Sequence, residues 1–113
     1  MNTVMELLDK RFKAKAMRSQ EVDITHPGVK VMTMHAAKGL EFPVVAVVGL
    51  EAGRLPMPAK DGVDEEEHLA RQRRLLFVAC SRAMRRLMVF AHRERPSQFA
   101  EALTEEFWDV EAL

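Results

Sequence analysis

Side chains able to bind a ligand are concentrated in one short segment of the chain. Thr33, His35, Lys38 and Glu41 supply a hydroxyl, an imidazole, an ammonium and a carboxylate, and Gly39 lies among them. Apolar runs precede and follow the segment, which places it where one strand ends and another begins. In α/β proteins ligands bind at such strand ends. A helical turn with solvated side chains is the alternative interpretation.

Length and composition describe one ordinary domain. The chain has 113 residues, 48% of them hydrophobic and 30% charged. A chain of this size can bury roughly two-thirds of its unfolded surface. No apolar run approaches the ~20 residues that cross a bilayer, and the first residues lack a secretory pattern. We therefore expect a cytoplasmic protein without a membrane segment.

Cysteine and histidine usage argues against disulfides and metal. Cys80 is the single cysteine, so an internal disulfide is impossible, and we expect its thiol to pack rather than react. The four histidines are scattered and show no zinc spacing with Cys80. No structural metal is expected.

The net charge is zero, but the charges are segregated. An acidic run comes first, formed by Asp61, Asp64, Glu65, Glu66 and Glu67. The segment from His68 to Arg95 contains eight arginines and one glutamate, which gives it a formal charge of +7. The arginines are Arg71, Arg73, Arg74, Arg82, Arg85, Arg86, Arg93 and Arg95. This segment could meet phosphate, although a solvated helix face explains a charge run equally simply.

Apolar spacing predicts the secondary structure of the first half. Residues 3–18 have the pattern of an amphipathic helix, and Pro27 with Gly28 makes a linker. Residues 29–34 are expected to form a strand. Residues 43–50 are apolar without alternation, as in a parallel strand covered on both faces. A loop of about ten residues follows, long enough to hold an insertion or a moving element.

The second half predicts a helix, a strand and a short helix. Asp64 precedes acids and then arginines, the order that suits a helix dipole, and residues 87–91 form another apolar strand. Pro96 and Ser97 open a short helix over about 98–103. Strands joined through a helix run parallel in a right-handed crossover. We expect an α/β fold, a partial parallel sheet of about three strands flanked by helices, within something larger.

Two motifs resemble a known family. Residues 31–45, VMTMHAAKGLEFPVV, resemble the fifth motif of UvrD/Rep/PcrA-type superfamily 1 DNA helicases. Residues 73–83, RRLLFVACSRA, resemble the sixth, and Pro96-Ser97-Gln98-Phe99 resembles the segment that follows it. The resemblance covers residues 29–103. It implies the carboxyl-terminal portion of a second RecA-like motor domain over 29–113, with residues 1–28 as an amino-terminal helix and linker.

The resemblance also implies roles at the nucleotide. Arg82 matches the arginine finger that reaches the terminal phosphate of ATP, and Glu41 matches the glutamate that contacts the ribose. Gly39, two residues before Glu41, would let the backbone turn tightly there. From the residues alone, Arg82 could instead cap its helix or pair with an acid. Glu41 could instead compensate a helix dipole or make a surface ion pair.

Other positions of the motifs imply DNA contacts. Thr33 and His35 stand where relatives touch the backbone of single-stranded DNA, and Lys38 could serve phosphate or remain solvated. Three departures accompany the match. The family usually has threonine at Ser81 and tyrosine at Phe77, and it has acids where Ala70-Arg71-Gln72 stands.

Essential parts of an ATPase are absent from the sequence. It contains no Gly-x-x-x-x-Gly-Lys phosphate loop and no acidic pair after an apolar strand. Magnesium would be held by a first motor domain, supplied in cis or in trans. The sequence thus predicts part of an ATP-dependent DNA helicase or translocase, of a kind used in DNA repair, inactive alone. A stand-alone module binding nucleic acid or a partner, and a purely structural domain, are the alternatives.

Overall fold

A computed structural model describes residues 15–17, 25 and 27–111. The chain divides into two compact units, residues 1–41 and residues 42–113. The order of elements is β1, β2, β3, α2, β4 and the 3₁₀ helix η1. The described elements therefore mix helix and strand, and the chain has the expected α/β fold.

The first unit contains a short pair of parallel strands. β1 (Lys15–Met17) pairs with β2 (Lys30–Met32), with Met17 opposite Met32. The helix expected over residues 3–18 is therefore wrong at Lys15–Met17, because backbone pairing with β2 outweighs the helical spacing of the sequence. Residues 3–14 and 18 of that expected helix lie outside the described residues. The division at residue 28 stays a prediction.

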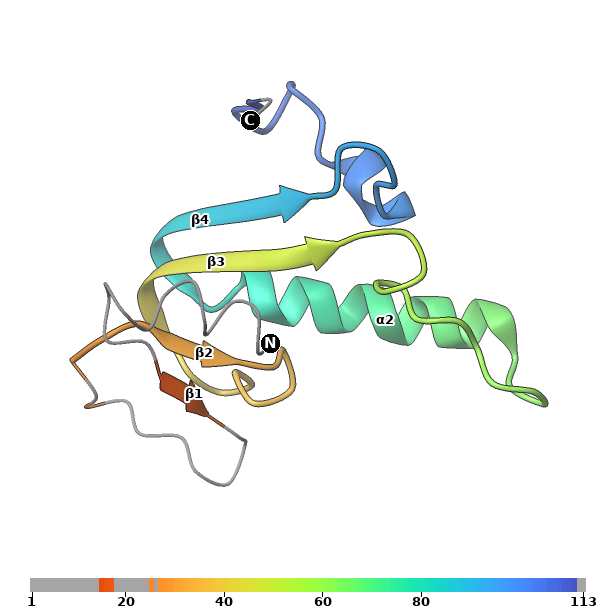
Figure 1. The fold of residues 1–113 in the computed structure, drawn as a ribbon, viewed down its shortest axis with the longest axis horizontal. Helices are drawn as coiled ribbons and strands as arrows, with labels where there is room; N and C mark the ends of the chain where they lie inside the picture. The colour runs from red at the N-terminus through yellow and green to blue at the C-terminus, as the bar shows by residue number, and fades with distance from the viewer. Residues whose placement is uncertain (1–14, 18–24, 26, 112–113) are drawn as a thin grey trace. The chain divides into compact units, whose positions relative to one another are not determined.

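The second unit is built on two long parallel strands joined by a helix (Figure 1). β3 (Phe42–Leu50) pairs with β4 (Ala83–Ala91), and α2 (Glu65–Cys80) lies between them in the chain. The register runs from Phe42 opposite Ala83 to Leu50 opposite Ala91. The expected strand–helix–strand unit with parallel strands is confirmed.

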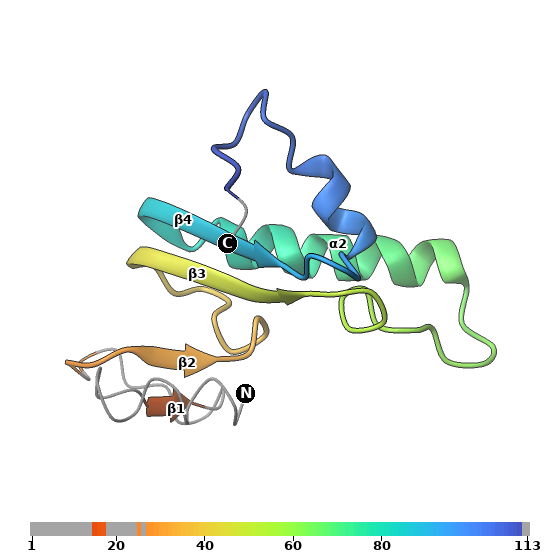
Figure 2. The same ribbon diagram turned by 45° about the horizontal axis from the view of Figure 1, so that its top comes forward.

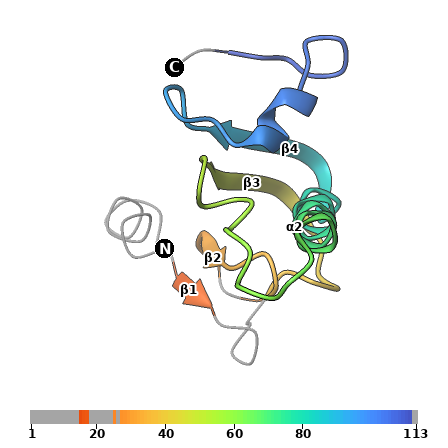
Figure 3. The ribbon, with the colours of Figure 1, turned by 90° about the vertical axis from the view of Figure 1, so that its right-hand side faces the viewer.

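Helix α2 begins where the sequence indicates. Asp64 is its N-cap, with Oδ1 accepting a hydrogen bond of 3.0 Å from the N–H of Glu66. Glu65, Glu66 and Glu67 fill the first turn, where negative charge favours the helix dipole. Leu76 and Ala79 are buried, and α2 lies along one side of the β3–β4 pair (Figure 3).

Two expectations about the sheet need correction. About three strands were expected in one parallel sheet, whereas the described strands form two separate pairs, β1–β2 and β3–β4. Both faces of β3 were expected to be covered, but Val44 and Val48 are 53% and 52% exposed. One helix against a two-stranded sheet leaves the other face uncovered.

A buried serine ties the segment after β4 to the loop after β3. Ser97 is 0% exposed, and its Oγ donates to the carbonyl of Leu55 and accepts from the N–H of Phe99. Its own N–H donates to the Leu50 carbonyl over 3.0 Å. Ser97 also caps η1 (Gln98–Ala102), the short helix that follows β4 in Figure 2.

Replacing Ser97 with alanine should destabilise the chain by about 1–3 kcal/mol, because two buried backbone groups lose their partner. Urea denaturation followed by circular dichroism measures the change. The matched control is Ser81→Ala, because the Ser81 hydroxyl also bonds a backbone carbonyl but is exposed. Equal losses for the two variants would show that burial of Ser97 is unimportant.

Partial burial makes Cys80 a poor nucleophile, as the sequence led us to expect. Desolvation near the end of α2 raises the pKa of the Cys80 thiol above its ordinary value. The thiol therefore stays protonated in the folded chain to a higher pH than in the unfolded chain. Its contribution to stability is present below the unfolded pKa and is lost as the pH rises through the folded pKa.

Iodoacetamide should alkylate Cys80 more slowly in the folded chain than in urea at pH 8, and the folded rate should rise steeply only at higher pH. Mass spectrometry of timed samples follows the reaction, with glutathione as the free-thiol reference. A folded rate equal to the rate in urea would contradict the raised pKa.

Candidate functional site

The segment after β2 forms a series of turns begun by Thr33. Thr33 Oγ1 accepts from the N–H of Ala36 over 3.2 Å, and the Thr33 carbonyl accepts from the N–H of Ala37. Ala36 is buried and Thr33 itself is exposed. The hydroxyl proton of Thr33 has no acceptor among the described residues, so it can be donated to a ligand.

Three further candidates in this segment present their side chains to solvent. His35, Lys38 and Glu41 are exposed, and within the described part of the chain their side chains make no hydrogen bond or ion pair. Their backbones are ordered by turns, as where Lys38 donates to the His35 carbonyl over 3.3 Å. An imidazole, an ammonium and a carboxylate are thus available on a defined backbone.

Gly39 is needed for the shape of this segment. Its φ is +82°, a conformation that residues with a Cβ rarely adopt. The next residue, Leu40, donates to the Ala37 carbonyl over 3.1 Å and closes the turn. The expected tight turn at Gly39 is confirmed, whereas its contact with nucleotide stays a prediction.

Arg82 lies between the end of α2 and the start of β4. Its Nε donates to the Val78 carbonyl over 3.1 Å, and Nη2 donates to Ser81 Oγ over 3.0 Å. Ser81 Oγ donates to the same carbonyl over 2.8 Å. The side chain is half-exposed, and it caps the carboxyl end of its own helix, the alternative role left open by the sequence.

A backbone hydrogen bond joins the two segments that carry the helicase resemblance. The N–H of Phe42 donates to the Arg82 carbonyl over 2.9 Å, and Phe42 lies opposite Ala83 in the register. Glu41 directly precedes Phe42 in the sequence. The amino ends of β3 and β4 are thereby held side by side with Arg82 at the edge.

Some arginines of the basic segment contact other side chains, and others make no such contact with the described residues. Arg71 makes an ion pair with Glu67, and Arg73 lies 5.8 Å from the centre of the Phe99 ring, a cation–π distance. Four others are exposed and make no ion pair with the described residues: Arg74, Arg85, Arg86 and Arg93. They keep this part of the surface positive.

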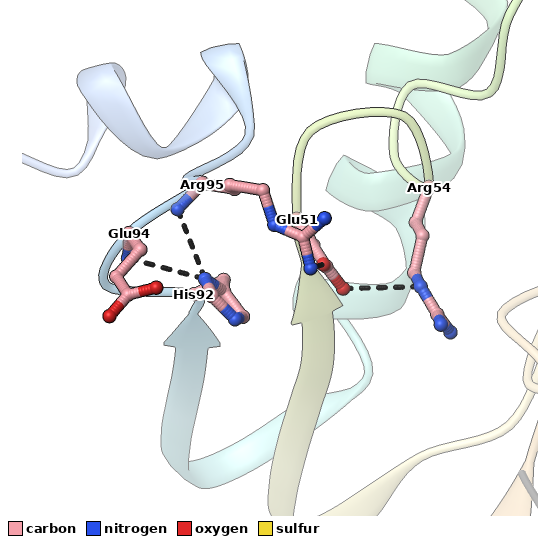
Figure 4. Close-up of polar contacts among 5 residues, drawn as sticks. All are labelled: Glu51, Arg54, His92, Glu94 and Arg95. Atoms are coloured by element: carbon pink, nitrogen blue, oxygen red, sulfur yellow. Dashed lines mark hydrogen bonds and ion pairs between the residues drawn. The ribbon is translucent and has the colours of Figure 1, made fainter.

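A second polar cluster, which the sequence did not indicate, lies at the carboxyl ends of β3 and β4 (Figure 4). Glu51 accepts from Arg95 over 2.6 Å and from Arg54 over 3.1 Å. His92 Nδ1 accepts from the N–H groups of Glu94 and Arg95 over 3.2 and 3.0 Å. Glu51 is distant from Arg95 in the sequence, so no local pattern reveals their contact.

The long loop after β3 is fastened to α2 at Met57. The N–H of Met57 donates to Gln72 Oε1 over 3.0 Å, and His68 Nε2 lies 2.6 Å from the Met57 carbonyl. A shallow pocket of about 410 Å³ forms beside this contact. Its lining includes Pro56, Met57, Glu65, Leu69 and Gln98. The two roles considered for the loop, an insertion and a moving element, both stay predictions.

The described residues contain neither a membrane-spanning helix nor a cluster of metal-binding side chains. They contain no helix long and apolar enough to span a bilayer. They also contain no group of three or more His, Cys, Asp or Glu side chains that could hold a metal ion.

Comparison with known proteins connects these features to one family. The sequence profile of the UvrD-like helicase C-terminal domain matches residues 2–94. The match extends the resemblance to the amino-terminal residues and ends before the Pro96–Phe99 segment. It therefore includes both motif-bearing segments and the strands β3 and β4 that join them.

Curated relatives agree with this match. DNA helicase II of Escherichia coli is 38% identical over 96 residues, which are 76% of this chain and 13% of that protein. The ATP-dependent DNA helicase Rep of E. coli is 42% identical over 81 residues, 69% of this chain and 11% of its own. The ATP-dependent DNA helicase PcrA of Leuconostoc citreum is 46% identical over 61 residues, 54% of this chain and 8% of its own.

The matched region is thus a small part of each of these relatives. The profile nevertheless covers most of this chain, and it includes the turn at Gly39 and the helix end at Arg82. The chain belongs to the UvrD-like helicase C-terminal domain family.

Proposed function

We propose that this chain is the carboxyl-terminal part of the second motor domain of an ATP-dependent DNA helicase or translocase. In this role it supplies groups to ATP and to single-stranded DNA, and another motor domain, in cis or in trans, grips the nucleotide. The observation that carries the proposal is the hydrogen bond from Phe42 to the Arg82 carbonyl, which joins the two matching segments. The relatives named as ATP-dependent DNA helicases support it.

Arg82 is the proposed arginine finger. Two of the acceptors of Arg82 are a carbonyl and a hydroxyl, both neutral, and a phosphate oxygen is a stronger partner for the guanidinium than either of these two. Bidentate contact with the terminal phosphate would stabilise the charge that spreads over its oxygens during transfer. The half-exposed position beside the strand ends leaves the side chain able to reach outward.

Glu41 is the proposed ribose contact. Its exposed carboxylate can accept hydrogen bonds from a sugar hydroxyl, as an acidic residue does in dinucleotide sites. The left-handed turn at Gly39 fixes the path of the backbone that leads to Glu41. These two residues and Arg82 are the nucleotide-binding set of the proposal.

Thr33, His35 and Lys38 are the proposed contacts to the DNA backbone. The hydroxyl of Thr33, an N–H of the His35 imidazole and the ammonium of Lys38 can each donate a hydrogen bond to a phosphate oxygen. Such contacts hold the strand without selecting its sequence. The proposal therefore predicts binding to single-stranded DNA without base preference.

The remaining catalytic parts belong to the other motor domain. That domain would supply the phosphate loop and the acids that hold magnesium, which neutralises charge on the phosphates when bound. This chain would orient the nucleotide from the opposite side. Alone it should not hydrolyse ATP.

A second candidate function is a module that binds nucleic acid without ATPase activity. Four exposed arginines favour it, because no acid among the described residues forms an ion pair with them and they make this surface positive. The two candidates differ in whether Arg82 matters for ATP turnover.

Arg82→Ala should lower the ATP turnover of the complete helicase by about 10³-fold or more, because the charge on the transferred phosphoryl group loses its partner. Nucleotide affinity should change much less. Steady-state turnover with saturating DNA and binding of a fluorescent nucleotide measure the two effects. Arg85→Ala is the matched control, since Arg85 is an exposed arginine nearby. Unchanged turnover in the Arg82→Ala variant would show that Arg82 has no catalytic role.

The purified chain should bind a fluorescent single-stranded oligonucleotide more weakly as salt rises, because phosphate contacts release counterions. Fluorescence anisotropy titrations at about 50 and 200 mM salt give the affinity at each concentration, and the two affinities give the slope of log affinity against log salt. Replacing His35 and Lys38 together with alanine should lower that slope by about one to two. Undetectable binding at both salts would reject DNA contact by this chain alone.

A further inference from the structure

The pocket beside Met57 is formed by three segments of the chain. They are the loop over residues 56–59, the first turns of α2 and the start of η1, and the pocket has a volume of about 410 Å³. This volume lies within the range of about 300–1,000 Å³ that is typical of ligand sites. We call it the α2 pocket.

The loop wall of the α2 pocket is fixed through the backbone of Met57. Its N–H donates to Gln72 Oε1 over 3.0 Å, and its carbonyl accepts from His68 Nε2 over 2.6 Å. A proline on each side of Met57 restricts the backbone further. The Met57 side chain is left 60% exposed. A wall that is already ordered lowers the cost of binding a ligand.

Apolar side chains and unpaired carboxylates share the lining of the α2 pocket. Met57, Leu69 and two prolines supply the apolar part, and Glu65 and Glu66 supply the carboxylates. Both glutamates are exposed, and their side chains make no hydrogen bond or ion pair with the described residues. Among the described residues, no lysine or arginine lines the pocket. Its negative charge is therefore available to a ligand.

The local charge indicates which ligands the α2 pocket accepts. Residues 56–67 contain five acids and one lysine, a formal charge of −4. This charge repels phosphate, so a nucleic acid is a poor ligand here. An arginine fits both parts of the lining, because its stem can lie on apolar surface while its guanidinium meets carboxylate oxygens in pairs.

We propose that the α2 pocket binds an extended peptide segment of a separate partner protein, which inserts an arginine and an apolar side chain. The arginine pairs with Glu65 and Glu66, and the apolar side chain covers Met57 and Leu69. Successive side chains of an extended peptide point to opposite sides, so the two inserted residues are two positions apart.

The position of the α2 pocket favours a separate partner. The pocket lies at the amino end of α2, and Arg82 follows the carboxyl end of the same helix (Figure 1). With 16 residues and a rise of about 1.5 Å each, α2 is about 24 Å long. A bound segment therefore leaves Arg82 accessible. The inference goes beyond the proposed function and is tested without ATP or DNA.

The test titrates a short peptide into the isotope-labelled chain and follows the backbone amides by NMR. The probe is a capped pentapeptide, leucine–glycine–arginine–glycine–leucine, and the control peptide carries neutral citrulline in place of arginine. Amide shifts should be largest at residues that line the pocket, such as Met57 and Leu69. The citrulline peptide should bind at least about tenfold more weakly, because it lacks the charge-assisted hydrogen bonds.

Matched substitutions test the carboxylates. Glu65→Gln combined with Glu66→Gln should weaken binding of the arginine peptide at least about tenfold. Glu105→Gln combined with Glu106→Gln removes the same charge from exposed positions outside the pocket and should leave the affinity within about twofold. Circular dichroism confirms that each variant is folded.

A second pair of variants tests the apolar part. Met57→Gln should weaken binding more than Met84→Gln does. The two methionines are 60% and 56% exposed, but only Met57 lines the pocket. Equal effects of these two substitutions would remove the apolar contact from the proposal.

Four results would overturn the proposal. The first two are an absence of amide shifts at millimolar arginine peptide, and equal binding of the arginine and citrulline peptides. The third is an assembly of the chain in light scattering that Glu65→Gln with Glu66→Gln disrupts, which identifies a second copy as the occupant. The fourth is loss of peptide binding in the complete helicase, which shows that another part of that protein fills the pocket. Turnover of the Arg82→Ala variant reports separately on the proposed function.

Discussion

The parallel pairing of β3 with β4 is the constraint on which the candidate site depends. The pairing begins with the hydrogen bond from Phe42 to the Arg82 carbonyl and continues through Val47 opposite Val89. A one-residue shift in this register would turn every side chain to the other face and would move Arg82 away from the start of β3. Val47, which is buried, and the half-buried Val45 and Val89 oppose such a shift, because it would expose them.

The carboxyl ends of the same strands are secured by different means. There the contacts are polar and come from residues far apart in the chain, with Glu51 bound to Arg95 and Ser97 bound to Leu55. Arg95 is exposed, so its ion pair with Glu51 adds little stability by itself. Ser97 is fully buried, and its hydrogen bonds are costly to lose. The serine therefore contributes more to this end of the sheet than the ion pair.

Patterns of short range predicted most of the second unit. Asp64 followed by three acids indicated where α2 begins, and uninterrupted valines indicated β3. Interactions between distant residues could not be read this way: Lys15–Met17 pairs with Lys30–Met32, and this pairing outweighs a helical pattern. The motif segments identified Gly39 and Arg82 as positions of interest, but only the structure shows that Arg82 caps α2 through Val78.

The contacts of Arg82 bear on its proposed role as the arginine finger. Two of its acceptors lie at the end of α2, where the Val78 carbonyl also accepts from Ser81. Hydrogen bonds to neutral acceptors at a half-exposed site are weak, roughly 0.5–1.5 kcal/mol each, whereas a charge-assisted bond to phosphate is about twice as strong. A phosphate would therefore be a stronger partner for the guanidinium than either of these two neutral acceptors. Ser81 would continue to cap the Val78 carbonyl after Arg82 leaves, so the helix end would keep a partner.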